Sequence, residues 1–287
     1  MKQNQLMMTL KLLSISIFTH AMDSSPGDYS WLGDNTKLLV GYAQHQSSDS
    51  LYSGSSNRIN DSELDVNVGI LRGLYYKEIN ENKFSFQSFA TFGYFPKAKI
   101  LSVEPQKEQG LGDLTIGGTF YPVTPDNIHH TTLGVSTFIT APIGDYNYNN
   151  INISQGFWSF TPQVGLIKEL NSSLFLNGFL DVTIYKDKKM DGALISKDPT
   201  YQFQTYLNYK PKQNYSFSFG YSGQYGGKVY LNNEYNGSKN RNDQIRLFAD
   251  QFISNDTQIM LMLGKDIYAQ GGFKQDIVTQ VRVVKVF

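Results

Sequence analysis

Seven charged residues, at alternate positions within partly apolar stretches, are the side chains most able to act on a solute. They are Glu63, Asp65, Asp113, Asp181, Arg246, Asp250 and Arg282. If the alternating stretches are strands of a closed barrel, as argued below, these seven side chains point into its lumen. Four aromatic residues are expected to point the same way: Phe175, Phe179, Tyr206 and Phe248. Acids and arginines that face one another across a pore set its solute preference, and apolar groups there line a route for greasy solutes. The same side chains could instead form a salt-bridge network that fills a narrow barrel.

Arginines inside such a barrel need anionic partners. An unpaired buried guanidinium carries a large desolvation cost, which a carboxylate partner offsets. We therefore expect Arg246 and Arg282 to pair across the lumen with acids such as Asp181, Asp250 or Asp113.

The histidines offer little support for catalysis. After the N-terminal leader the sequence contains His45, His129 and His130. Ser47 and Ser48 lie close to His45, so an outer-membrane enzyme that acts on lipid stays open as an alternative, but the spacing matches no familiar nucleophile and base. There is no cysteine, and no loop has the spacing of a calcium site. We expect no enzymatic activity, no metal and no cofactor.

Strands must position these residues, because apolar and polar side chains alternate along most of the sequence. Residues 64–70 and 215–222 show the alternation clearly. A period of two is typical of a β-strand with one apolar face. Twelve strands are predicted near residues 36–45, 62–77, 83–94, 111–121, 130–141, 157–169, 174–185, 200–210, 214–225, 243–253, 257–268 and 275–287. No apolar stripe of helical period separates them, so we expect almost no helix.

The connections between these strands alternate between long polar loops and short turns, as in transmembrane barrels. A closed barrel leaves no strand edge unpaired in lipid. Seven tyrosines near strand ends are expected to form interfacial girdles. They are Tyr75, Tyr76, Tyr94, Tyr121, Tyr185, Tyr209 and Tyr268.

Composition excludes other classes of protein. The 25 basic and 25 acidic residues balance, and only 17% of the chain is charged, so a nucleic-acid partner is not expected. The mean hydropathy is −0.35 and no apolar run reaches 18 residues, which argues against membrane helices. The 19 tyrosines, 19 phenylalanines and 25 glycines favour a sheet protein.

The two ends of the sequence indicate export and assembly. Residues 1–21 have a basic start, an apolar stretch and small residues before the expected cleavage point, which is typical of a cleaved signal peptide. Residues 22–35 are expected to be a flexible segment and residues 36–287 the barrel. The last strand ends in Phe287, which resembles the signal read by the barrel assembly machinery, although Lys285 stands where an aromatic or apolar residue is usual.

Several motifs resemble a known bacterial family. They are Gly110–Pro122 (GLGDLTIGGTFYP), Ala141–Tyr146 (APIGDY), Asp198–Gln204 (DPTYQFQ), Gly264–Asp266 (GKD) and the C-terminal tail. The sequence over residues 62–287 is similar to the transporters labelled "meta-pathway phenol degradation" proteins. This resemblance implies an outer-membrane barrel that passes aromatic compounds.

Together these observations predict an all-β chain forming a single antiparallel transmembrane barrel of about twelve strands in the bacterial outer membrane. Its expected partners are outer-membrane lipid, the barrel assembly machinery and a small-molecule solute. The expected function is a passive channel or transporter for small solutes, aromatic and hydrophobic ones among them. The alternatives are the lipid enzyme and a structural or adhesive barrel with a plugged lumen.

Overall fold

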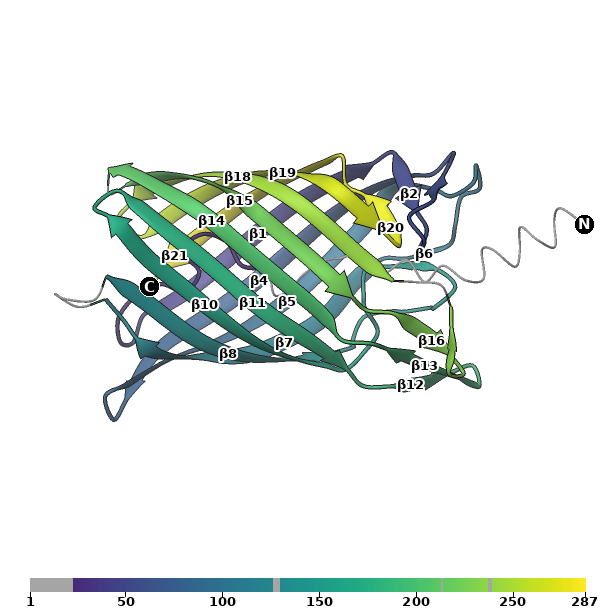
Figure 1. Ribbon diagram of the computed structural model, residues 1–287. Helices are drawn as coiled ribbons and strands as arrows, with labels where there is room; N and C mark the ends of the chain where they lie inside the picture. The colour runs from purple at the N-terminus through teal and green to yellow at the C-terminus, as the bar shows by residue number, and fades with distance from the viewer. Residues whose placement is uncertain (1–22, 126–129, 213, 237–238) are drawn as a thin grey trace, which may run out of the picture.

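The computed structural model describes residues 23–125, 130–212, 214–236 and 239–287. The predicted signal peptide and His129 lie outside these ranges. Twelve long strands form one closed barrel (Figure 1). They are β1 (Lys37–Ser48), β4 (Glu63–Ile79), β5 (Asn82–Lys99), β7 (Gly110–Val123), β8 (Thr131–Ala141), β10 (Ser159–Asn171), β11 (Leu174–Tyr185), β14 (Thr200–Lys212), β15 (Tyr215–Gly226), β18 (Asn240–Ser254), β19 (Thr257–Gln270) and β21 (Ile277–Val286).

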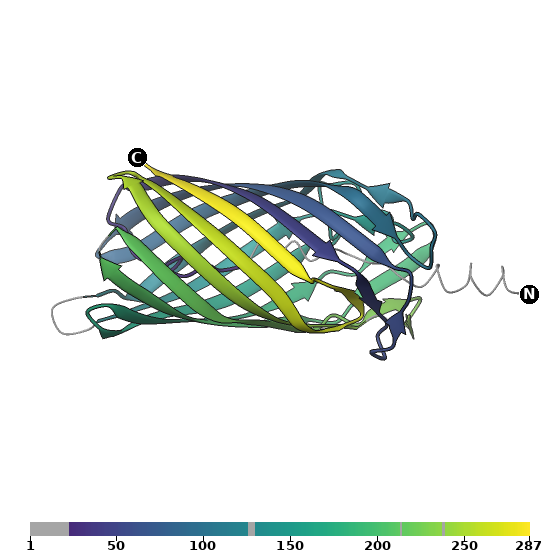
Figure 2. The same cartoon turned by 90° about the horizontal axis from the view of Figure 1, so that it is seen from above.

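Each long strand pairs antiparallel with its neighbour along the chain, and β1 closes the barrel against β21 (Figure 2). The closing register runs from Leu38 opposite Val286 to Ser47 opposite Ile277. Beyond it, the Phe287 N–H donates to the Lys37 carbonyl at 2.9 Å. The twelve predicted strands and the antiparallel closed barrel are confirmed. Nowhere in the described ranges is there a helix long and apolar enough to cross a membrane.

The long connections all lie at one end of the barrel, which we call the loop end, and the chain's C-terminus lies at the other, the turn end (Figure 1). Three small sheets form within the long connections. They contain β2 (Ser50–Tyr52), β3 (Arg58–Ile59) and β20 (Gly272–Lys274); β12 (Lys188–Met190), β13 (Ala193–Lys197), β16 (Val229–Leu231) and β17 (Glu234–Tyr235); and the parallel pair β6 (Lys107–Glu108) and β9 (Ile151–Asn152).

Apolar side chains cover the outside of most strands. On β15, Phe217 and Phe219 are 53% and 55% exposed, whereas Ser216 and Ser218 point inward and are buried. Leu180, Leu247 and Leu261 on other strands are exposed to a similar degree. Water-facing surfaces seldom carry so continuous an apolar cover, whereas the lipid-facing wall of a membrane barrel requires it.

On β4 the alternating apolar residues face the lumen, unlike those of β15. Leu64, Val66 and Val68 are buried inside, so Glu63 and Asp65 point outward. Glu63 pairs with Lys97, and Asp65 accepts a hydrogen bond from the Ser47 hydroxyl at 2.7 Å. The inward orientation predicted for these two acids is therefore wrong. The assumption that apolar faces point outward fails here because apolar side chains of the loops pack into the lumen from the loop end.

These apolar side chains form a cluster that fills the loop end of the lumen. We call it the loop-end cluster, and it contains Leu51, Leu64, Val66, Val68, Phe95, Ala98, Ile100, Ile151, Ile153 and Phe273. Leu51 from β2 is completely buried, and Phe273 comes from β20. Long loops therefore contribute to the interior of the barrel as well as to its rim.

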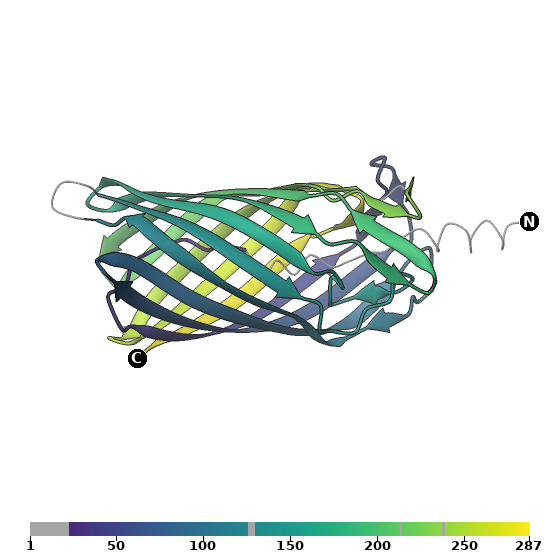
Figure 3. The same cartoon turned by 90° about the horizontal axis from the view of Figure 1, so that it is seen from below.

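The chain before β1 lies inside the barrel. Residues 23–36, which we call the N-terminal segment, run through the lumen toward the turn end, where β1 begins (Figure 3). Ser24, Ser25 and Tyr29 are buried there. We expect a flexible segment at residues 22–35; the structure places residues 23–36 inside the lumen, where several of them contact the wall.

Candidate functional site

The N-terminal segment begins with a tight turn in the middle of the lumen. The Asp28 N–H donates to the Ser25 carbonyl at 3.1 Å, and the Ser30 N–H donates to the Gly27 carbonyl at 2.9 Å. Gly27 has a φ of 85°, a left-handed conformation that glycine adopts without strain. The turn directs the Asp28 carboxylate toward the wall formed by β4, β1 and β21.

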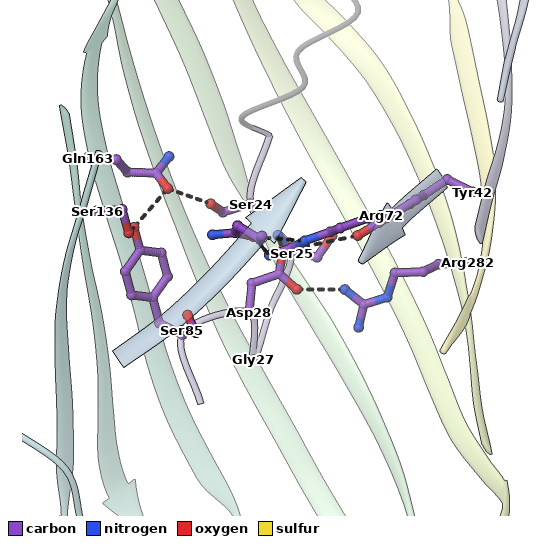
Figure 4. A network of polar contacts seen from close by, with 12 residues as sticks. Ser24, Ser25, Gly27, Asp28, Tyr42, Arg72, Ser85, Ser136, Gln163 and Arg282 are labelled. Carbon is purple, nitrogen blue, oxygen red and sulfur yellow. Dashed lines mark hydrogen bonds and ion pairs between the residues drawn. The ribbon is translucent and has the colours of Figure 1, made fainter. Parts of the chain in front are cut away.

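Asp28 bridges two arginines of that wall (Figure 4). Its Oδ1 lies 2.7 Å from Arg282 Nη1, and its Oδ2 lies 3.2 Å from Arg72 Nη1. The side chains of Arg72, Arg282 and Asp28 are all within 10% of full burial. Ion pairs so poorly hydrated are strongly coupled, because loss of one partner leaves a buried charge uncompensated.

Asp23 makes the second set of charged contacts. Its Oδ2 lies 2.8 Å from Arg246 Nη2 on β18. Its Oδ1 accepts hydrogen bonds from the Gln202 and Gln204 side chains of β14, at 2.9 and 2.6 Å. The two acids of the segment thus contact both sides of the barrel interior.

The ring of Tyr29 packs against a part of the inner wall that carries two glycines and so has no side chains. Gly134 on β8 and Gly165 on β10 are directly opposite each other in the sheet. A Cβ atom at either position would lie 2.4 Å from the Tyr29 ring. The Tyr29 hydroxyl also hydrogen-bonds Ser136 at 2.6 Å and donates to Gln163 at 2.9 Å. The wall is therefore shaped to receive this segment.

Trp31 closes the lumen nearer the turn end. Its ring meets the edges of Tyr76 and Tyr121, each with ring centres 5.6 Å apart. These two tyrosines are buried inside the barrel, so their predicted place in an interfacial girdle is wrong. By contrast, Tyr94 and Tyr209 are exposed on the outer wall.

The acids predicted to pair with Arg246 and Arg282 have other partners. Asp113 accepts hydrogen bonds from the Ser154 hydroxyl at 2.5 Å and from the Gln155 N–H at 2.8 Å. Asp181 accepts from the Gln163 side chain at 3.1 Å, and Asp250 accepts from Gln258 at 2.8 Å. The predicted pairings are therefore wrong.

The predicted inward positions of Asp113, Asp181, Asp250, Arg246 and Arg282 agree with these contacts. The alternation of side chains along the strands could not identify the partners of Arg246 and Arg282, because both arginines pair with acids that precede the first strand.

The four aromatic candidates lie on the inner face. Phe179, Tyr206 and Phe248 are buried, and the Tyr206 and Phe248 rings meet edge to face with centres 5.1 Å apart. Phe175 lies near the turn end, where Lys210 Nζ is 4.8 Å from its ring centre. Tyr206 and Phe248 thus lie beside Arg246 in the barrel interior, whereas Phe175 lies apart from it.

His45 lies on the outer face of β1. Its Nδ1 is 2.8 Å from the Asn67 side-chain oxygen, and the Ser47 hydroxyl donates to Asp65. His130, at a short turn, pairs with Glu169 at 3.1 Å. Neither described histidine makes a hydrogen bond with a serine, so the geometry adds no support to the enzyme alternative.

Little free space remains in the lumen around the segment. One cavity of about 50 Å³ is bordered by Asp23, Arg246, Phe89, Phe248 and Tyr42, among others. A second, of about 40 Å³, borders Asp113 and Asp181. Each holds a few water molecules at most. A larger hollow, of about 1100 Å³, lies on the outer wall between exposed apolar side chains such as Phe219 and Leu261.

Sequence reasoning missed the N-terminal segment and Arg72. A signal for Arg72 was present, because it has the same parity as Leu64, Val66 and Val68 on β4. If that face pointed outward, Arg72 would lie in lipid, where a charge is costly. The conflict could have shown that this face points inward. The segment itself has no such periodic signal.

Comparisons with known proteins agree with this architecture. The family model described as the MetA-pathway of phenol degradation matches residues 48–283. An outer membrane channel from Pseudomonas putida F1 is 24% identical, with a TM-score of 0.82 over 92% of this chain and 100% of that one. A search of curated proteins found no significant match.

Two autotransporter barrels are more distant. The transport unit of AIDA-I from Escherichia coli is 11% identical, with a TM-score of 0.50 over 100% of this chain and 98% of that one. The β domain of the Bordetella autotransporter BrkA is 8% identical, with a TM-score of 0.50 over 88% and 100%. At these identities the three structures show the fold.

Proposed function

The chain belongs to the family of the MetA-pathway of phenol degradation, and from this premise we propose that it is a passive channel for small aromatic or otherwise apolar solutes. It is an outer-membrane β-barrel, with a closed twelve-strand wall and an apolar outer face. The loop end faces the exterior in this arrangement, and the turn end faces the periplasm.

One observation carries the proposal: apolar side chains fill the loop end of the lumen. Membrane barrels usually have polar interiors. Here Val66 and Val68 of β4 and Phe95 of β5 point inward and join Leu51 and Phe273 from the loops. Contact with this cluster favours solutes that carry an apolar ring or chain and disfavours sugars and small inorganic ions, since wholly polar solutes would lose hydration there without gaining hydrogen bonds.

Uptake into vesicles tests this selectivity. The full chain is inserted into vesicles whose outer leaflet is lipopolysaccharide, and entry of labelled toluene and glucose is compared. We expect toluene to enter faster than in protein-free vesicles, and glucose to show no increase. Val68→Gln should reduce toluene uptake, while Val103→Gln, at an exposed loop position, should not. Equal acceleration of both solutes would contradict the proposal.

A barrel with a permanently plugged lumen is the second candidate, because the N-terminal segment and the small cavities favour it. The two differ in what happens when the segment is loosened. Asp28→Ala removes the shared partner of Arg72 and Arg282. Increased conductance of this variant in planar bilayers supports the channel, and unchanged low conductance together with absent uptake supports the plug.

Assembly in the membrane is part of the same proposal. The terminal strand β21, which ends beside Phe287, would be read by the barrel assembly machinery, and the exposed apolar wall would contact lipid. The unusual Lys285 is compatible with such recognition, because its charge is paired: its Nζ lies 2.5 Å from Asp256 at the turn end. Phe287→Ala should reduce the amount of heat-modifiable barrel in outer membranes. Ile253→Ala, an exposed apolar position at the same end, is the matched control.

A further inference from the structure

Three arginines in the lumen are held in place by neutral groups of the wall. Arg72 donates to the Gln87 side chain at 2.6 and 3.0 Å. Arg282 donates to Gln258 at 3.2 Å. These contacts do not depend on the N-terminal segment, so the two guanidinium groups keep their positions if it moves away.

Arg246 is held in the same way. It donates to Gln244 at 2.5 Å and to the Tyr206 hydroxyl at 3.2 Å. The carboxylates paired with the three arginines are those of Asp23 and Asp28 alone, among the described residues. The anions in direct contact with the arginines are therefore supplied by the segment, whereas the wall carboxylates of Asp266 and Asp250 reach Arg246 and Arg282 only through Gln244 and Gln258.

The site also has unused hydrogen-bonding capacity. Arg282 is 6% exposed, and its Nε has no hydrogen-bond partner among the described atoms. The cavity beside Arg246 is too small for an aromatic molecule while Asp23 and Ser25 border it. Withdrawal of the segment would join this space to the volume that residues 23–28 now occupy.

Aromatic rings accompany the charges. The Arg72 guanidinium lies 4.8 Å from the centre of the Phe89 ring. Phe89 and Phe248 both border the cavity beside Arg246, and Phe248 packs against Tyr206. A ligand with a flat ring and an anionic group would find partners for both parts beside these arginines.

We propose that Arg72, Arg246 and Arg282 form a binding site for small aromatic carboxylates, and that Asp23 and Asp28 occupy it as internal substitutes for the ligand. This inference rests on the proposed channel and adds an anionic class to the aromatic solutes that it passes. A neutral solute that displaced the segment would leave buried arginines without anions. A carboxylate solute replaces the lost anion, so displacement is less unfavourable.

Trp31 provides a readout of the segment. The chain has two tryptophans, and Trp158 is exposed at the start of β10. In a full-length Trp158→Phe background, Trp31 fluorescence reports whether the indole stays between Tyr76 and Tyr121. We expect benzoate to shift this emission at a concentration at least tenfold lower than benzyl alcohol, which has the ring without the charge, or acetate, which has the charge without the ring.

Variants separate the site from general effects on the barrel. Arg246→Gln and Arg282→Gln should each weaken the benzoate response at least tenfold and leave a heat-modifiable barrel. Arg241→Gln is the matched control, because Arg241 is half exposed and pairs with Asp243 away from the segment. Asp23→Asn should strengthen benzoate binding, measured by calorimetry, because it removes a competing carboxylate.

Each result has a distinct meaning. Equal responses to benzoate and benzyl alcohol, or to benzoate and acetate, would overturn the proposed ligand class. A benzoate response that survives Arg246→Gln and Arg282→Gln would overturn the site. Failure of the channel is seen separately, as benzoate binding without uptake or conductance in any variant.

Discussion

Charged and polar contacts hold the N-terminal segment in the middle of the lumen, whereas apolar side chains fill the loop end. The N-terminal segment is held by Asp23 and Asp28, while Leu51, Val66 and Phe273 are packed together without directional bonds. Apolar packing is insensitive to which greasy molecule supplies the contact. Ion pairs require a specific partner. The loop end is thus suited to admit apolar solutes, and the middle of the lumen to discriminate among them.

Loss of Asp28 should give the largest effect on this contrast. Asp28→Ala leaves Arg72 and Arg282 without their shared carboxylate, and breaking a buried pair of this kind costs about 3–5 kcal/mol. We expect the N-terminal segment to detach from the wall, which iodide would report as increased quenching of Trp31 fluorescence.

Asp34→Ala is the matched control. Asp34 is exposed near the turn end and contacts Lys77 at 3.3 Å. Its pKa is lowered chiefly by a hydrogen bond from the Glu78 N–H. Exposed ion pairs contribute little to stability, so Trp31 should remain protected in this variant. Similar iodide quenching in the two variants would show that the buried pairs do not hold the segment.

Leu51→Ala tests the loop end independently. Leu51 is fully buried in the loop-end cluster, and such truncations cost about 2–5 kcal/mol. We expect faster protease cleavage in the loop that carries β2 and β3, with the Trp31 signal unchanged. A simultaneous change in Trp31 would show that the two halves of the lumen are coupled, and the contrast between them would lose its meaning.

The barrel itself was readable from the sequence because each strand carries a local signal. On β15 the alternation of aromatic and small polar residues specifies both the strand and its sidedness. On β4 the same rule gave the strand but the wrong face, since Leu64 and Val66 pack against loops that are distant in sequence. Alternation identifies two faces, and only tertiary contacts decide which of them is inside.

The site was less predictable than the fold. Arg246 and Arg282 could be placed in the lumen from parity, together with the need for an anion beside each. Their partners, Asp23 and Asp28, come from a non-strand segment 223 and 254 residues earlier in the chain, and no period connects them. Gly134 and Gly165 read as ordinary strand glycines until Tyr29 is seen against them.

Gly165→Ala tests whether the wall is shaped for the segment without altering charge. The added Cβ would lie 2.4 Å from the Tyr29 ring, and such overpacking costs about 1–3 kcal/mol. We expect partial exposure of Trp31, smaller than in Asp28→Ala. Gly178→Ala on β11 is the matched control, because nothing lies within 4 Å of its added Cβ. An unchanged Trp31 in both variants would mean that the ring of Tyr29 adapts freely.

Lys188, at the loop end, differs from the arginines of the lumen because, among the described residues, its ammonium group contacts aromatic rings and not a carboxylate. Lys188 Nζ lies 3.3 Å from the centre of the Tyr146 ring and 4.3 Å from that of Phe157, and it donates to the Gly156 carbonyl at 2.9 Å. Burial lowers the pKa of Lys188 to about 8, with Asp113 opposing the shift and Lys197 adding to it.

The smallest predicted effect follows from this lowered pKa. The unfolded loop binds the Lys188 proton up to its ordinary pKa of 10.5, so between about pH 8 and 10.5 it holds more protons than the folded loop. Stability of the folded loop should therefore rise with pH in this window. Partial exposure of the side chain keeps the change small, below about tenfold in the rate of protease cleavage at the loop end. Lys188→Met should abolish the pH dependence, whereas Lys189→Met, altered at the exposed neighbouring position, should retain it. The ratio of the cleavage rates of the two variants cancels the pH dependence of the protease itself. A ratio that stays constant from pH 7 to 10.5 would contradict the prediction. It would show that the folded loop accommodates the charge of Lys188 as well as the lumen accommodates the arginine charges.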